Sequence, residues 1–217
     1  KPAQKRYFFP LMPGVTHVPY PYCYRCPFKQ TYPECQYWCV DFLDEYILQK
    51  YVPPEDIAAM LFEPIQGEGG YVVPPPDYFQ RLKKLADKYG ILLMDDEVQA
   101  GMGRTGKWFA IENWNVDPDI LCSAKALASG LPLGATVANA KIMDWVGGSH
   151  ASTFGGNPVS CVAAGAVIDV IKQEKLLENA TKQGSHIVKR LEELKERSEI
   201  VGDVRGKGLM MGMEIVE

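Results

Sequence analysis

From residue 57 onward, the apolar residues are arranged in two patterns: short continuous runs and repeats at helical spacing. Short apolar runs typical of buried strands occupy residues 58–62, 91–95, 119–122 and 135–138. Apolar residues at helical spacing predict helices over 77–89, from Pro158 onward, and over 179–198, and a last apolar run at 208–216 predicts a strand. Strands that alternate with helices predict an α/β fold with a mostly parallel sheet. In such folds ligands bind at the carboxyl ends of the strands.

The first 55 residues are rich in proline and aromatic residues and show little periodicity. Proline at this density prevents regular helix and interrupts strand ladders. We therefore expect an extended, ordered loop whose aromatic side chains grip a surface. One amphipathic helix is predicted within it over 38–50, with Val40, Leu43, Tyr46 and Ile47 on one face.

Composition narrows the class of protein. The chain has 217 residues, of which 47% are hydrophobic and 23% charged, enough to bury a core and to exclude disorder as its main state. The longest apolar stretch, 159–168, falls short of the roughly 20 residues that cross a bilayer. The net charge of -4 argues against a nucleic-acid binder. Without a recognisable secretory signal, we expect a cytoplasmic protein with no nucleic-acid or membrane partner.

The second predicted strand ends at an acidic pair. Asp96 and Glu97 are followed by Gln99 and by the glycine loop 101–107, which places polar groups at the carboxyl end of a strand. The loop fits the phosphate-binding pattern G-x-x-x-x-G-K, but that pattern needs Ser or Thr next, and Trp108 stands there. A nucleotide hydrolase is therefore not expected, and the acidic pair is either a catalytic element or a solvated strand end.

Three further segments follow predicted strands or open a helix. Lys125 lies among small and apolar residues, where burial would lower its pKa and make the amine a nucleophile, although a surface lysine is the simpler interpretation. Glu63 and Glu68 lie in a glycine-rich loop at the same predicted edge. Residues 149–158 carry hydroxyls and glycines into a helix, as in an anion site or an ordinary helix N-terminus.

Four cysteines cluster near the N-terminus, at positions 23, 26, 35 and 39. The spacing of Cys23, Cys26, Cys35 and Cys39 is compatible with a four-thiolate zinc site. Two disulfides, or reduced thiols packed among aromatic residues, are the other interpretations. The remaining two cysteines, Cys122 and Cys161, are expected to be buried in apolar surroundings.

Five ordered motifs together resemble the class III aminotransferases, pyridoxal-phosphate (PLP) enzymes of fold type I that include 4-aminobutyrate and ornithine aminotransferases and related amino-acid racemases. The motifs are EPIQGEGG at 63–70, DEVQAGMGRTG at 96–106, SAKAL at 123–127, LPLGA at 131–135 and HASTFGGNP at 150–158. The resemblance implies a three-layer large domain with a central sheet flanked by helices, incomplete at both ends. Residues 1–172 would form the central part of the PLP-binding large domain. Residues 173–217 would form connecting helices and the start of an incomplete C-terminal small domain.

The resemblance also implies roles for residues at the cofactor. Lys125 would carry PLP as a Schiff base and then move the substrate's proton. Asp96 would pair with the pyridine nitrogen, and Gln99 would bind the phenolic oxygen of the ring. Thr153 would bind the cofactor phosphate of a neighbouring subunit, which implies a homodimer with active sites shared across the interface. The cysteine set is not part of the general family pattern.

The implied reaction is transamination of an amino acid or ω-amine, of the 4-aminobutyrate or ornithine type, with 2-oxoglutarate as acceptor. Glu68 matches the family's gate glutamate, and Glu63 matches a second acidic position near the substrate. An amino-acid racemase on the same scaffold would use the same Lys125, and a catalytically inactive metal-binding or structural fragment is the alternative from another class. The family's phosphate-gripping loop and substrate-carboxylate arginine lie outside these residues, so the isolated chain is expected to bind PLP weakly and to be inactive.

Overall fold

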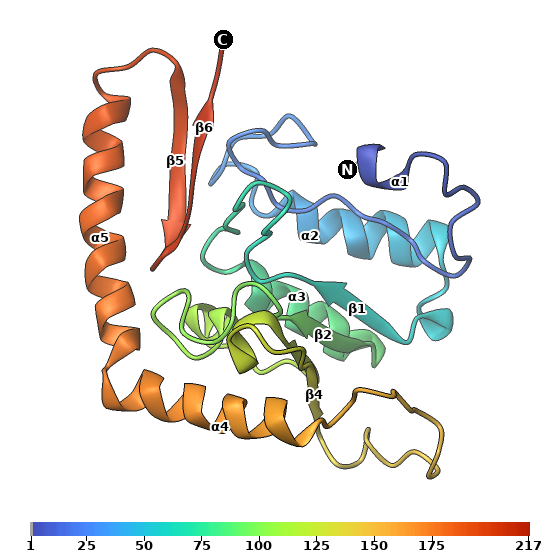
Figure 1. Cartoon of the computed structure of the whole chain (residues 1–217). Helices are drawn as coiled ribbons and strands as arrows, with labels where there is room; N and C mark the ends of the chain where they lie inside the picture. The colour runs from blue at the N-terminus through green and yellow to red at the C-terminus, as the bar shows by residue number, and fades with distance from the viewer. Residues whose placement is uncertain (1) are drawn as a thin grey trace.

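A computed structural model describes residues 2–217 as a four-stranded sheet with helices around it and a separate two-stranded hairpin (Figure 1). The sheet has the order β1-β2-β3-β4, formed by Ala59–Phe62, Leu92–Asp96, Ile120–Ser123 and Ala135–Ala138. β1, β2 and β3 are parallel, and β4 is antiparallel to β3. The prediction of a mostly parallel α/β fold is therefore confirmed.

Four helices follow the predicted positions with small shifts at their ends: α2 (Trp38–Phe42), α3 (Tyr78–Tyr89), α4 (Pro158–Gln173) and α5 (Leu176–Lys195). The short helix α1 (Pro2–Lys5) was not predicted, because the proline-rich first 55 residues favoured an extended loop there. Shorter 3-10 turns occupy Pro54–Asp56, Ala110–Trp114 and Lys125–Ala128. Among residues 2–217, no helix combines the length and the apolar character needed to cross a membrane.

The helix predicted over 38–50 changes its winding halfway. α2 continues as a π-helical stretch, Leu43–Tyr51, in which residues five apart lie over one another. Leu43 and Leu48 are therefore the buried pair, whereas Tyr46 is 51% exposed. The prediction that Tyr46 shares the buried face is wrong, because it assumed regular α-helical spacing.

The C-terminal hairpin contains one strand that the pattern did not predict. β5 (Val201–Lys207) pairs antiparallel with β6 (Met210–Ile215), and β6 lies within the predicted strand 208–216. β5 mixes glycine and charged residues in its sequence VGDVRGK, which hides the alternation typical of a half-buried strand. These residues have a low intrinsic preference for strand, and they form one because they pair with β6.

The core forms where α3 packs against the sheet. Phe79 of α3 is fully buried, with its ring 4.7 Å from Phe62 of β1 and 5.1 Å, edge-on, from Trp114. Such aromatic pairs contribute about 0.5–1.5 kcal/mol each beyond the burial of their area. Gly90 ends α3 in the left-handed conformation, as predicted, and its N–H donates to the last carbonyls of the helix.

The N-terminal segment is mainly loop, as expected, but only part of it grips the molecule. Tyr7, Phe8 and Phe9 are exposed, so the expectation that the aromatic residues bind a surface fails for these three among the described residues. Tyr20, further along, donates its hydroxyl to the carbonyl oxygen of Glu63 at 2.7 Å. The later part of the loop is therefore anchored at the carboxyl end of β1.

The packing of α5 against the hairpin predicts opposite effects for two helical glycines. A Cβ added at Gly184 would lie 2.2 Å from the backbone oxygen of Gly208, so Gly184→Ala should lower the free energy of unfolding by about 1–3 kcal/mol. Gly165→Ala, on α4, is the matched control because a Cβ there meets nothing within 4 Å. It should be neutral or raise stability by up to about 1 kcal/mol. Denaturant midpoints measure both, and equal midpoints would contradict this packing.

Candidate active site

Three loops meet at the carboxyl edge of the sheet. Because β1, β2 and β3 are parallel, with Phe62 opposite Asp95 and Asp96 opposite Cys122, the residues that follow each strand lie at one edge. Glu63 follows β1 there, and Lys125 follows β3. The convergence of these segments, predicted from the sequence, is confirmed.

Lys125 and Gln99 are in direct contact. The Nζ of Lys125 donates to the Oε1 of Gln99 at 2.7 Å, which joins the loop after β3 to the loop after β2. Lys125 has φ +45°, in the left-handed region that long side chains rarely adopt, and strain of this kind concentrates at functional sites. Its side chain is exposed, which agrees with the simpler interpretation of a surface lysine and not with partial burial.

Gly67 lets the loop after β1 approach Gln99. A Cβ on Gly67 would lie 2.7 Å from the Cδ of Gln99, so no side chain fits at this position without moving the amide. The N–H of Gly67 donates to the Oε2 of Glu63 at 2.8 Å, which closes the start of this loop. Glu63, Gly67, Gln99 and Lys125 therefore form one continuous chain of contacts. Glu68 is exposed on the same loop.

The end of β2 places acidic residues on two sides of the strand. Asp96 is half-buried, and its Oδ1 accepts the N–H of Val98 at 3.0 Å, which holds the carboxylate at the strand end. Asp95 and Glu97 lie on the opposite side and are 0% and 1% exposed. Glu97 Oε1 accepts the N–H of Ile111 at 2.8 Å.

The buried pair is electrostatically costly in its charged form. Burial, followed by the nearby Glu97 charge, raises the pKa of Asp95 to about 9. Burial also raises the pKa of Glu97, and hydrogen bonds from the backbone of Ile111 and Ala110 oppose that rise. The Asp95 carboxyl lies against that of Glu97, and no N–H of the described residues pairs with either Asp95 oxygen, so the neutral acid is the form that this core favours.

Thr153 lies away from these contacts. It is exposed on the loop between β4 and α4, and none of the contacts described for residues 2–217 joins it to Lys125. The following helix start behaves as an ordinary cap: Asn157 Oδ1 accepts the N–H of Val159 at 2.9 Å and of Ser160 at 3.3 Å, with Pro158 in the first position.

The glycine loop 101–107 is a packing element. A Cβ on Gly208, in the hairpin turn, would lie 2.5 Å from the backbone carbon of Thr105, and Leu209 N–H donates to the oxygen of Arg104 at 2.9 Å. A Cβ on Gly106 would lie 2.2 Å from the Oγ1 of Thr181 on α5. The glycines allow this close approach of loop, helix and hairpin.

Two contributors to the site were not singled out from the sequence. Gly67 supports Gln99, and Tyr20 holds the backbone of Glu63 and Pro64 through its hydroxyl. A tyrosine among many aromatic residues carries no local signal of its partner 43 residues away. A glycine in EPIQGEGG signals a tight loop but not which side chain the loop covers.

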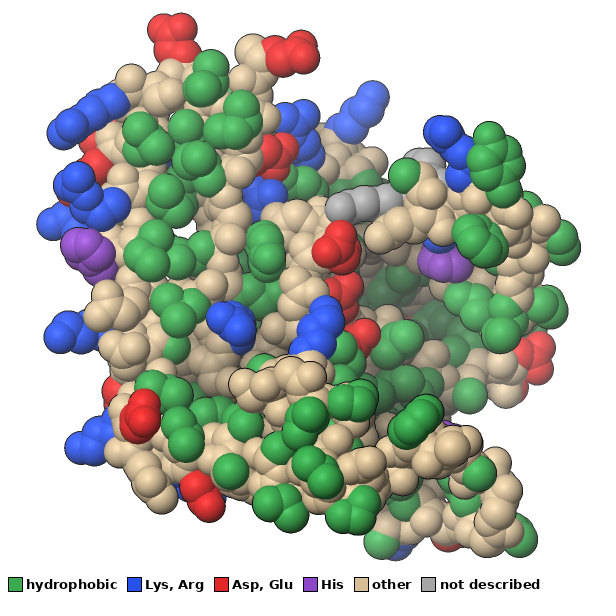
Figure 2. Space-filling view, viewed as in Figure 1, with side chains coloured by type: hydrophobic (Ala, Val, Ile, Leu, Met, Phe, Trp, Pro, Cys, Tyr) green, Lys and Arg blue, Asp and Glu red, His purple; other side chains and the backbone are tan. Residues whose placement is uncertain are grey.

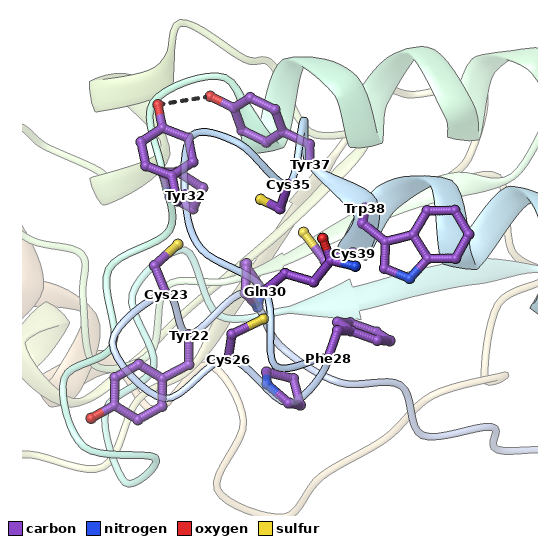
Figure 3. A pocket seen from close by; sticks show the side chains of 13 residues that line it. Tyr22, Cys23, Cys26, Phe28, Gln30, Tyr32, Cys35, Tyr37, Trp38 and Cys39 are labelled. Carbon is purple, nitrogen blue, oxygen red and sulfur yellow. Dashed lines mark hydrogen bonds between the residues drawn. The ribbon is translucent and has the colours of Figure 1, made fainter.

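The four N-terminal cysteines line one pocket together with aromatic and proline side chains (Figure 3). All four are free thiols, and no group of three or more His, Cys, Asp or Glu in residues 2–217 is arranged to hold a metal ion. Burial and neighbouring thiols raise the pKa of Cys23 to about 11 and that of Cys39 to about 12. This arrangement favours packed, uncharged thiols. Cys161 is exposed and Cys122 half-buried, so their expected burial is wrong.

Comparison with known proteins places the chain in a family. The model of the family "Aminotransferase class-III" matches residues 1–217. A leucine/methionine racemase of Thermococcus litoralis is 52% identical over 94% of the chain, and an alanine/serine racemase of Pyrococcus horikoshii is 48% identical over 99%. The chain spans 46% of the length of each of these relatives. An amine transaminase from an uncultivated Pseudomonas species, solved in its PLP-bound form, has a TM-score of 0.93 and 38% identity, covering 100% of this chain and 51% of its own.

The buried Asp95 predicts a stability that falls as pH rises. The native state holds a proton on Asp95 between about pH 4 and 9 that the unfolded chain releases, so unfolding becomes easier across that window, on the order of 1 kcal/mol per pH unit. Asp95→Asn removes this proton linkage and should flatten the dependence of the melting temperature on pH between 6 and 9. Asp117→Asn, at an exposed position, should keep the wild-type slope. Parallel wild-type and Asp95→Asn profiles would contradict a protonated Asp95.

The thiol pocket predicts slow alkylation. Raising the pKa of Cys23 from 9.0 to about 11 lowers its thiolate fraction at pH 8 by about 100-fold, and that of Cys39 by more. Iodoacetamide should therefore label both at least about 100-fold more slowly in native protein than in urea, as followed by peptide mass spectrometry. If labelling in urea required a reductant, the thiols would be paired as disulfides; if native labelling rose on adding a chelator, they would hold a metal.

Proposed function

The chain belongs to the class III aminotransferase family, PLP enzymes of fold type I, and from that premise we propose that the full protein is a PLP-dependent racemase of neutral amino acids. The observation that carries the proposal is the identity of 52% and 48% to two racemases, over nearly the whole of this chain. Those relatives are named for leucine, methionine, alanine and serine. Their substrates therefore define the side chains to be tested first.

The residues at the sheet edge fit this cofactor. PLP supplies an electron sink that stabilises negative charge at the α-carbon of a bound amino acid. The chain offers three of the groups that such a ligand requires: the amine of Lys125, the carboxylate of Asp96 and the amide of Gln99. The 2.7 Å contact between Lys125 and Gln99, and the exposure of Lys125, support a site that is assembled and accessible.

Lys125 would hold the cofactor and move the proton. Its amine would bind PLP covalently, and once the substrate's amino group replaces it, the freed amine would take the proton from the α-carbon. Asp96 would keep the pyridine nitrogen protonated through a charged hydrogen bond, which contributes about 1.5–3 kcal/mol. Val98 keeps that carboxylate at the end of β2.

Racemisation and transamination differ in the destination of the proton and the amino group. A racemase takes the proton from one face of the α-carbon and adds a proton, which water would supply, to the opposite face, and it needs no second substrate. An aminotransferase keeps the amino group and passes it to a 2-oxo acid. Transamination of an amino acid or ω-amine, of the 4-aminobutyrate or ornithine type, with 2-oxoglutarate is the second candidate, supported by the likeness to a solved amine transaminase.

Substrate access and assembly complete the proposal. Glu68 would act at the entrance for the substrate and Glu63 beside it. Thr153 would reach the cofactor phosphate of a second copy in a homodimer. Supporting this, the loop and helix around Thr153 expose apolar side chains, including Phe154 and Val162, the latter 74% exposed, and Figure 2 shows such side chains along α4. Residues 1–172 would belong to the large domain and 173–217 to the connection and the start of the small domain.

Chiral chromatography of the full-length protein's products separates the two reactions. The full-length protein is incubated with L-leucine, L-methionine, L-alanine or L-serine, the amino acids for which the two relatives are named, with and without 2-oxoglutarate. Formation of the D-enantiomer without the oxo acid is the expected result. Retention of the L-enantiomer, with glutamate formed only when 2-oxoglutarate is present, would establish the aminotransferase instead.

Lys125→Ala should abolish the reaction, because the amine of Lys125 is the group proposed to take the proton from the α-carbon. We expect a loss of kcat of at least about 1,000-fold. Lys84→Ala, at an exposed position on α3, should retain wild-type activity. Borohydride reduction followed by peptide mapping should place the PLP label on Lys125, and a label on any other lysine would refute the assignment.

A further inference from the structure

We propose that Arg205 is a positioning residue for the loop that carries Glu68. Arg205 lies on β5, and it holds the backbone oxygen of Gly70 from a hairpin 135 residues further along the chain. Through that contact it fixes the entrance at which the substrate binds. The inference rests on the proposed function, because only there does Glu68 meet a substrate.

The contact is a two-donor fork on one acceptor. The Nε and Nη2 of Arg205 donate to the oxygen of Gly70 at 3.1 and 2.7 Å. Gly70 has φ +115°, a conformation suited to glycine, so its carbonyl takes a direction that other residues rarely provide. Two donors in a fixed plane restrain that oxygen in both direction and distance.

The loop that receives this contact is closed on itself. Gln66 N–H donates to the oxygen of Val72 at 3.1 Å, and Gly70 N–H donates to the oxygen of Gly67 at 3.1 Å. Glu68 lies between these bonds, and Gly67 packs against Gln99. Because these hydrogen bonds make the loop rigid, a displacement of Gly70 would also displace Glu68.

Arg205 is itself held rigidly. Its Nη1 is 2.6 Å from Asp203 Oδ2 and 2.9 Å from Glu214 Oε2, and its guanidinium lies over the Tyr22 ring, 4.9 Å from the centroid. The side chain is only 14% exposed. Tyr22 and Arg25 also donate to Glu214, so one carboxylate joins the N-terminal segment to the hairpin.

The hairpin touches the loop at a second point, which makes the coupling specific. A Cβ on Gly212 of β6 would lie 3.2 Å from the oxygen of Gly70 and 3.2 Å from the Cβ of Tyr71. Both strands of the hairpin therefore meet the same turn. The hairpin is proposed to be the start of the small domain. A change in the position of the small domain relative to the large domain would then move the loop at the substrate entrance.

Arg205→Lys in the full-length, PLP-loaded protein tests the proposal. The variant keeps the charge near Asp203 and Glu214 but cannot form the planar fork on Gly70. We expect hydrogen exchange of the amides in residues 66–72 to become about 10-fold faster and KM to rise about 3- to 10-fold. The kcat should change less than about 2-fold, and the PLP absorbance spectrum should stay unchanged.

Arg25→Gln is the matched control. Arg25 binds the same Glu214 from an exposed position and makes no contact with Gly70, so its exchange rates and KM should stay within about 2-fold of wild type. If Arg205→Lys is poorly folded, Asp203→Asn weakens the same anchor and should change exchange and KM in the same direction by less.

Three results would overturn the proposal. Unchanged exchange in residues 66–72 would show that Arg205 does not position the loop, and faster exchange without a change in KM would show that the loop does not govern substrate entry. Equal effects in the Arg25→Gln control would show a general weakening of the hairpin. Exchange needs no substrate, and the wild-type chiral assay tests the proposed reaction separately, so failure of that reaction is distinguishable from failure of the role of Arg205.

Discussion

The register of three short parallel strands is the constraint on which the candidate site depends. Side chains alternate between the two faces of a strand, so β2 buries Asp95 and presents Asp96 at the carboxyl edge. A slip of one residue would exchange these two acids. The carboxylate proposed to meet the cofactor would then be buried, and the acid that the core keeps neutral would face the site. Pairing of Asp96 with Cys122 prevents this exchange. It also fixes the end of β3, and with it the position of Lys125, three residues after Cys122 along the chain.

Close backbone approach is the second organising feature. Gly67 lies against the side chain of Gln99, Gly184 against the hairpin turn, and Gly208 against Thr105. A glycine-rich sequence that suggests phosphate binding serves here to bring loop, helix and hairpin within contact. The sequence already argued against phosphate binding by residues 101–107, because Trp108 stands where Ser or Thr is needed, and the structure gives these residues a packing role.

The features that lower the stability of the fold lie near the site, and packing in the core offsets them. Lys125 adopts a strained backbone conformation, and Asp95 lies buried against Glu97 with no N–H of the described residues paired to its oxygens. The aromatic cluster of Phe79, Phe62 and Trp114 stabilises the same layer of the molecule. Proteins often violate local preferences at functional sites, and the coincidence of these violations with the carboxyl edge is consistent with the proposed chemistry.

The sequence by itself determined the α/β class, the end of α3 at Gly90, the start of α4 at Pro158 and the family motifs, because each depends on a few neighbouring residues. It also predicted that the loops after β1, β2 and β3 meet, since parallel pairing alone requires it. Only the tertiary structure decided the π-helical winding that buries Leu48, the strand β5 and the contact of Arg205 with Gly70. These depend on partners far away in the chain, whose approach is set by packing of the whole fold and leaves no local pattern.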